Sequence, residues 1–76
     1  METRFINLFA EVLELEDDHN LTTITIFREL DEWDSLAYLS VIAMIDEEFD
    51  IVIEGNDFKK LITIGDLINE IQRKSQ

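Results

Sequence analysis

Apolar residues recur at helical spacing near both ends of the chain. Near the start, the positions that share one helix face are Phe5, Leu8, Phe9, Val12 and Leu13. Thr3 precedes all of them and is a candidate N-cap, so we predict a first helix over about 3–15. Near the end, Thr63 is a second candidate cap, and a stripe follows it: Ile64, Leu67, Ile68 and Ile71. This stripe predicts a last helix over about 64–73.

The middle of the chain has an apolar pattern with two faces. One stripe has the spacing of a buried helix face: Tyr38, Val41, Ile42, Ile45 and Phe49. A second stripe begins with Leu36, Leu39 and Ala43 and continues into acids: Asp46, Glu47 and Asp50. We predict a helix over about 35–50, and because so short a chain can hardly bury both faces, we expect the second stripe to be an exposed docking surface. The alternative is that neighbouring helices cover it.

The segments between these helices predict a long connection and a short helix. Residues 16–34 have no sustained helical period and contain polar residues typical of loops: Asp17, Asp18, Asn20 and Thr22. We expect the connection to be packed down by its own apolar side chains: Leu21, Ile24, Ile26, Phe27 and Leu30. Further on, Gly55 suits a turn and Asn56 or Asp57 suits a cap, which predicts a short helix over about 57–61.

These elements together predict an all-α fold, a small four-helix bundle with a long first loop and a short third helix. Two β-branched stretches, "LTTITIF" and "DIVI", leave a pair of strands and an α+β fold open as the alternative. The helical prediction is favoured because each strand candidate is short and isolated between strong helical patterns.

Length and composition exclude several classes of protein. With 76 residues, of which 46% are hydrophobic, the chain fits one folded domain over 1–76 that is too small to enclose a large active site. It has no cysteine, which excludes disulfides, thiolate zinc sites and cysteine nucleophiles. The first residues lack the order of a signal peptide, and no apolar run approaches the ~18 residues of a membrane span. We therefore expect a soluble cytoplasmic protein without membrane insertion.

The charge is strongly negative and unevenly distributed. The net charge is −12, and the segment from Glu29 to Asp57 contains ten acids and no Lys or Arg. Nucleic acid and anionic membranes are therefore disfavoured partners, because both require basic side chains to neutralise phosphate. A basic patch on another protein is favoured instead. The alternative is that the acids only keep a small protein in solution.

The sequence contains no recognisable catalytic set or metal site. His19 is the only histidine and lies in a polar loop segment, so Ser35 has no evident base and no Ser-His-Asp arrangement can be built. The acidic runs "DDHN" and "DEEFD" lack the ligand spacing and the glycine of a calcium loop. We therefore expect a protein with no catalytic activity of its own and no resident metal.

One short motif points to a known family. Asp34, Ser35 and Leu36 stand at the start of the second predicted helix, and an acidic helix follows. With this length, charge and helix order, the chain resembles the acyl carrier protein family over nearly its whole length. The resemblance implies a four-helix bundle of acyl-carrier type in which 4′-phosphopantetheine, supplied by coenzyme A, is attached covalently to Ser35. The arm would carry acyl, aminoacyl or polyketide-type groups as thioesters.

The resemblance also implies partners and their contact residues. A phosphopantetheinyl transferase would modify Ser35 next to the flanking Asp34 and Leu36, and an acyl ligase, synthase or acyltransferase with a basic patch would dock on the carrier. The residues that we expect at the docking surface are Trp33, Leu39, Ala43, Asp46 and Glu47. We expect the carrier to be a monomer.

Some positions depart from the family pattern. Glu32 and Trp33 replace the common Gly-Ala before the motif, and Ala37 and Ser40 stand where acids are frequent. Trp33 either caps the core or forms part of a docking edge. These departures favour a carrier of a specialised lipid or secondary metabolite pathway over one of bulk fatty acid biosynthesis.

A second hypothesis belongs to another class of function. The chain could be an unmodified acidic interaction protein, an inhibitor or a nucleic-acid mimic, that binds a basic protein surface. Such a protein needs negative charge distributed over its surface, and it has no use for an exposed Ser35 beside Leu36 and Leu39.

Overall fold

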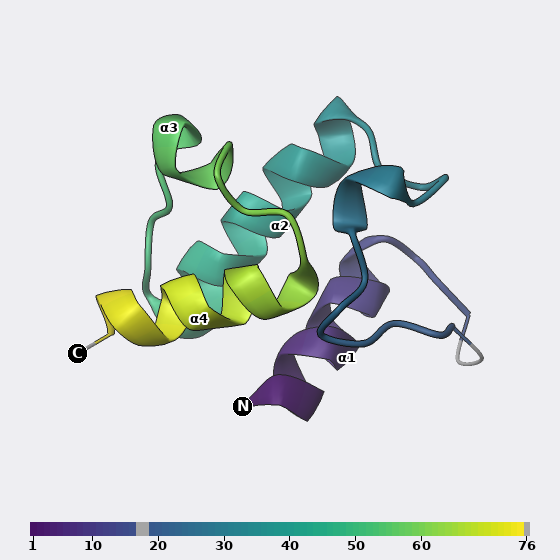
Figure 1. Cartoon of the computed structure of the whole chain (residues 1–76), viewed down its shortest axis with the longest axis horizontal. Helices are drawn as coiled ribbons and strands as arrows, with labels where there is room; N and C mark the ends of the chain where they lie inside the picture. The colour runs from purple at the N-terminus through teal and green to yellow at the C-terminus, as the bar shows by residue number, and fades with distance from the viewer. Residues whose placement is uncertain (17–18, 76) are drawn as a thin grey trace.

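The computed structural model describes residues 1–16 and 19–75, and the regular structure within these ranges is helical (Figure 1). In chain order the elements are α1 (Glu2–Val12), the 3₁₀ turn η1 (Phe27–Glu29), α2 (Ser35–Phe49), α3 (Gly55–Phe58) and α4 (Ile64–Lys74). No strand occurs in the described part of the chain, so the predicted all-α fold with a short third helix is confirmed. Asp17 and Asp18 of the predicted connection lie outside the described residues.

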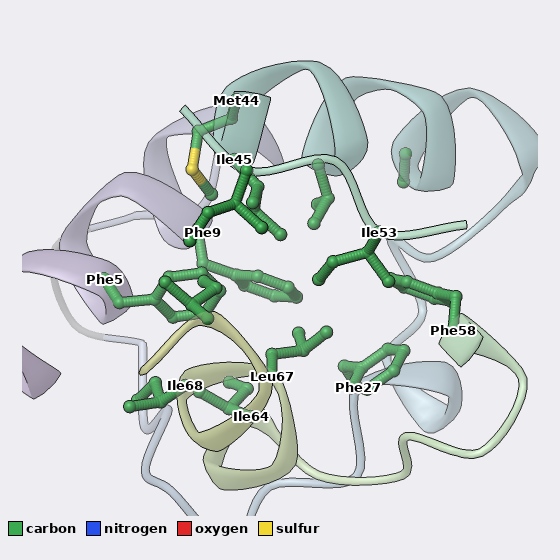
Figure 2. Close-up of a cluster of buried hydrophobic side chains, with 14 of the residues drawn as sticks. Phe5, Phe9, Phe27, Met44, Ile45, Ile53, Phe58, Ile64, Leu67 and Ile68 are labelled. Carbon is green, nitrogen blue, oxygen red and sulfur yellow. The ribbon is translucent and has the colours of Figure 1, made fainter. Parts of the chain in front are cut away.

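The core is formed where α1 packs against both α2 and α4. Figure 2 shows Phe9, Ile45 and Leu67 pointing toward one another from these three helices. The largest side chains with almost no exposure are Phe5, Phe9, Phe27, Val41, Ile45, Ile64, Leu67 and Ile71. Full burial of a side chain of this size stabilises a fold by ~1.5–3 kcal/mol, so these residues hold the long helices together.

The first helix ends at Val12 rather than near residue 15 because its last turn closes early. Glu14 adopts the left-handed conformation, with φ of 57°. Its N–H donates to the carbonyl of Glu11 at 3.0 Å, and the N–H of Leu15 donates to the carbonyl of Ala10 at 2.9 Å. This pair of bonds is a Schellman motif, which satisfies the carbonyls of the last turn and turns the chain away.

The predicted cap at Thr63 is confirmed, and the one at Thr3 is wrong. Thr63 Oγ1 accepts a hydrogen bond from the N–H of Asp66 at 3.1 Å. Asp66 Oδ2 in turn accepts from the N–H groups of Thr63 at 3.1 Å and Ile62 at 2.9 Å. This reciprocal capping box fixes where α4 begins. At α1 the N-cap position is taken by Met1 without a side-chain hydrogen bond, because the helix begins before Thr3.

The long connection is packed by fewer apolar residues than predicted. Phe27 is fully buried, but Ile24 and Ile26 are 81% and 40% exposed, so their predicted role as anchors is wrong. The reason is an isolated antiparallel bridge between Ile26 and Thr63, the residue before α4. Successive side chains of an extended chain point to opposite sides, so the buried Phe27 leaves Ile26 on the surface.

The same bridge requires a glycine in α4. Near it, the N–H of Ile64 donates to the carbonyl of Thr25 at 3.0 Å, and the N–H of Gly65 donates to that of Thr23 at 2.8 Å. A Cβ at Gly65 would lie 2.9 Å from the Thr23 carbonyl oxygen, too close for any other residue without a backbone shift. The stretch "LTTITIF" thus contributes one bridge and no strand, which rules out the α+β alternative for the described residues.

The predicted bounds and cap of α3 are wrong. The helix begins at Gly55 rather than near residue 57, so Gly55 is its first residue and not a preceding turn. Glu54 occupies the N-cap position without a side-chain hydrogen bond, in place of the predicted Asn56 or Asp57. Local capping chemistry therefore does not position this helix.

Arg28 instead holds the end of α3 from η1. Its Nη2 donates to the carbonyl of Phe58 at 2.8 Å, and its Nη1 donates to the carbonyl of Leu61. The guanidinium carbon lies 4.8 Å from the ring centroid of Phe27 and 5.4 Å from that of Phe58. A cation at the C-terminal end of a helix satisfies free carbonyls and complements the helix dipole. The position of α3 is thus set by a tertiary contact.

Two aliphatic residues of α2 test the assignment of its faces. Ile45→Ala should lower the free energy of unfolding by about 2–5 kcal/mol, because it opens a cavity at a fully buried position. Leu39→Ala, at a position 59% exposed on the same helix, should change it by less than about 0.5 kcal/mol. Urea unfolding followed by circular dichroism measures both. Equal losses would mean that Leu39 belongs to the core.

The capping box makes stability depend on pH. Hydrogen bonds from the N–H groups of Ile62 and then Thr63 hold the pKa of Asp66 below its ordinary value of 3.8. A carboxyl whose pKa is lower in the folded state contributes stability that is present above the unfolded pKa and is lost as the pH falls through the folded pKa. Asp66→Asn should therefore lower stability at pH 7 and reduce its loss below about pH 4.

Asp46→Asn is the control for this pH dependence, because the Asp46 carboxylate accepts none of the described hydrogen bonds. Thermal unfolding from pH 7 to pH 3 compares the two variants with the parent chain. If both variants follow the parent curve with the same shape, Asp66 does not supply the acid-sensitive stability.

Candidate functional site

Ser35 is the first residue of α2, and its side chain is exposed. Asp34 occupies the N-cap position in an extended conformation, and its Oδ1 accepts a hydrogen bond from the N–H of Ala37 at 2.7 Å. This bond makes Asp34 the N-cap and fixes the residue at which the helix begins. Ala37 is buried, so the first turn of α2 is anchored while Ser35 faces outward. The arrangement presents a hydroxyl on a rigid element.

The start of α2 favours a negative group on Ser35. The first N–H groups of a helix have no partner within it, and the helix dipole places partial positive charge at this end. No described hydrogen bond joins Ser35 to a carboxylate or to His19, whose Nδ1 accepts from the N–H of Leu21 at 3.2 Å. Within the described ranges, no three His, Asp or Glu side chains gather as a metal site would require.

Trp33 packs into an aromatic cluster next to the site. Its half-buried ring stacks nearly parallel to those of Phe9 and Phe58, with centroids 6.1 Å and 6.2 Å away. It also meets the ring of Phe27 edge-on at 4.9 Å. Trp33 therefore caps the core, the first of its two interpretations, and its role at a docking edge stays a prediction.

A hollow of about 490 Å³ opens beside Ser35. Its wall combines aromatic rings, two basic residues and the start of α2: Arg28, Trp33, Asp34, Ser35, Tyr38, Gly55, Phe58 and Lys59. Neither this hollow nor the role of its basic residues is predicted by the sequence pattern. A signal was present, since Arg28 and Lys59 are the basic residues that bracket the acidic segment from Glu29 to Asp57.

The second stripe of α2 is exposed, as predicted. Leu36 and Leu39 are 71% and 59% exposed, and the others are also on the surface: Ala43, Asp46 and Glu47. On the opposite side Val41 and Ile45 are fully buried. Neighbours at this spacing lie on one helix face, so the structure brings this set together.

The acids of this face keep their charge available. The ion pairs formed by the described residues join Arg4 to Glu48, Arg73 to Glu70, and Lys74 to Asp57 and Glu70. None of these pairs includes Asp46 or Glu47. The face therefore combines exposed leucines with unpaired carboxylates, which suits a partner with a basic patch.

Ala37 and Ser40, the two residues that stand where the family often has acids, differ from each other in exposure. Ser40 is half-buried, and Ala37 is buried under the first turn of α2. Ala37 is therefore not part of the exposed face, and its lack of charge does not affect that face. The departure from the family pattern that remains near Ser35 is mainly that of Trp33.

Comparisons with known proteins identify the family of this chain. The chain matches the family described as "Phosphopantetheine attachment site" over residues 3–71. It is 45% identical over 42 residues to an acyl carrier protein of Desulforapulum autotrophicum, covering 55% of this chain and 54% of that protein. It is 39% identical over 41 residues to an acyl carrier protein of Exiguobacterium sp., covering 54% and 52%. The alignments thus span about half the length of these relatives. No helix in the described ranges is long and apolar enough to cross a membrane.

Proposed function

The chain belongs to the acyl carrier protein family, and we propose that it carries acyl groups as thioesters on a 4′-phosphopantetheine arm attached to Ser35. The observation that supports this most is an exposed serine at the first residue of an acidic helix, directly after the capping Asp34. The residues present fit the group, because Ser35 opens onto a hollow with two basic residues and stands at the positive end of a helix. When bound, the group supplies the thiol that holds the acyl chain.

Attachment needs only an accessible hydroxyl from this chain. A phosphopantetheinyl transferase would bring the base that takes the Ser35 proton. The Ser35 oxygen forms the new bond to phosphorus, and the adenosine bisphosphate half of coenzyme A leaves. In this proposal the carrier is the substrate of the transferase and supplies no catalytic group of its own.

The exposed face of α2 is the proposed contact for partner enzymes. Leu36 and Leu39 supply apolar contact area beside Ser35, while Asp46 and Glu47 attract a basic patch on an acyl ligase, synthase or acyltransferase. Charge of this kind raises the rate of encounter more than the final affinity. The carrier acts as a monomer in the cytoplasm.

The replacement of a small residue by Trp33 supports a specialised pathway rather than bulk fatty acid biosynthesis. The Trp33 ring reaches Phe9, Phe27 and Phe58, so it fills space next to Ser35 that a small side chain would leave open. The first part of an arm attached to Ser35 would therefore meet aromatic walls, with the cargo held at the far, thiol end of the arm. The acyl, aminoacyl or polyketide-type nature of the cargo depends on the partners.

Modification is tested by intact mass. Incubation with coenzyme A and a broad-specificity phosphopantetheinyl transferase should add one phosphopantetheine to the chain. Ser35→Ala should abolish the addition, whereas Ser40→Ala, at the half-buried serine of the same helix, should retain it. An unchanged mass with several active transferases would favour the unmodified acidic interaction protein instead.

Docking is tested by charge reversal on α2. The double variant Asp46→Lys, Glu47→Lys should lower kcat/KM of the transferase for the carrier roughly tenfold at low salt, or about 1.4 kcal/mol. The difference from the parent chain should shrink as added salt screens the charges. The matched control is a double reversal at two exposed acids, Glu2 at the start of α1 and Glu14 two residues beyond its end. If the control variant loses as much as the α2 variant, net charge rather than this face governs docking.

A further inference from the structure

We propose that the hollow beside Ser35 holds the first part of the attached arm, with Lys59 paired to its phosphodiester and the rings of Trp33, Tyr38 and Phe58 against its dimethyl carbons. This inference rests on the proposed attachment to Ser35. It goes beyond that function because it assigns residues of η1, α3 and the turn after α3 to the arm.

Position is the first argument for this occupant. Ser35 is itself part of the wall of the hollow, so a group joined to its oxygen begins at the hollow. The volume of about 490 Å³ lies within the range of ~300–1,000 Å³ typical of small-molecule sites. A tethered group reaches such a site at high effective concentration, so weak contacts are enough to hold it.

Charge is the second argument. The chain has a net charge of −12 and six basic residues, and two of these six line this one hollow. The arm begins with a negatively charged phosphodiester at the Ser35 oxygen. An acidic peptide or a free acyl chain is not joined to Ser35 and would not place a negative group at this point. The Asp34 carboxylate also lines the hollow, but its Oδ1 accepts from the N–H of Ala37, and the two cations leave the wall with a net positive charge that complements the arm.

Arg28 and Lys59 have different tasks in this hollow. Arg28 is held in place, because it donates to the carbonyls of Phe58 and Leu61. Lys59 is exposed and forms none of the described ion pairs or side-chain hydrogen bonds. Lys59 is thus the cation that can move to the phosphate, and Arg28 supplies fixed positive charge behind it.

The apolar walls suit the next part of the arm. The rings of Tyr38 and Phe58 meet edge-on at 4.9 Å, and that of Trp33 stacks on Phe58 at 6.2 Å. Quaternary carbon with two methyl groups packs well against such rings, as any compact apolar group does.

The test uses the chain converted to its modified form, with conversion verified by intact mass. Uniformly ¹³C,¹⁵N-labelled protein receives an unlabelled arm from coenzyme A. Isotope-filtered nuclear Overhauser spectra should then show contacts from the arm methyl protons to the ring protons of Trp33 and Phe58. Trp33 is the only tryptophan, so its fluorescence should also change on conversion.

Matched lysine variants test the charge pairing. Lys59→Gln should reduce the methyl contacts and the fluorescence change by at least about half, and Lys59→Arg should restore them. Lys60→Gln should leave both as in the parent chain, because Lys60 does not line the hollow. Circular dichroism checks that the exposed substitutions leave the fold intact.

The outcomes separate the two proposals. A verified mass increase without methyl contacts or a fluorescence change overturns the proposed binding of the arm in the hollow. The proposed attachment to Ser35 is not affected by that result. Equal effects of Lys59→Gln and Lys60→Gln overturn the assigned role of Lys59. No mass increase at all overturns the proposed function on which this inference rests.

Discussion

The ring of Trp33 lies 4.9 Å from that of Phe27 and stacks on those of Phe9 and Phe58, so one side chain connects the first helix, η1 and α3. Aromatic pairs of this geometry add ~0.5–1.5 kcal/mol beyond the burial of their area. Because Trp33 precedes Ser35 by only two positions, this contact also fixes where the start of α2 stands against the rest of the fold. The exposure of Ser35 and the shape of the hollow beside it both depend on that position.

Elements with local signals could be predicted from the sequence. The starts of α2 and α4 follow from Asp34 and from the capping box of Thr63, which need only residues three positions away. The end of α1 could not, because its left-handed residue is Glu14 and not the usual glycine. The start of α3 was also missed, since that helix depends on Arg28, a residue 30 positions from Phe58. Where local capping signals were weak, tertiary contacts determined the bounds of the helix.

The candidate site divides in the same way. The exposed face with Leu36 and Leu39 could be predicted, because helical periodicity alone separates it from Val41 and Ile45. The hollow could not, because it brings Ser35 next to Lys59 only after α3 has packed. The order of charges along the sequence was only a weak signal for the hollow. One basic residue at each end of an acidic segment does not show that these two residues come together in the fold.

The two proposals together couple docking to the release of the arm. Asp46 lies about 16 Å along α2 from Ser35, at 1.5 Å per residue, which exceeds the ~10 Å Debye length at 0.1 M salt, so cations held at Asp46 alone are largely screened from the phosphodiester. A partner that covers the whole exposed face, from Leu36 to Glu47, also places its basic patch beside Ser35, where it competes with Lys59 for the phosphodiester. Linkage is reciprocal, so if docking weakens the contact of the arm with Lys59, that contact weakens docking by the same factor. The affinity of the hollow for the first part of the arm then sets how readily a partner enzyme displaces the arm from it.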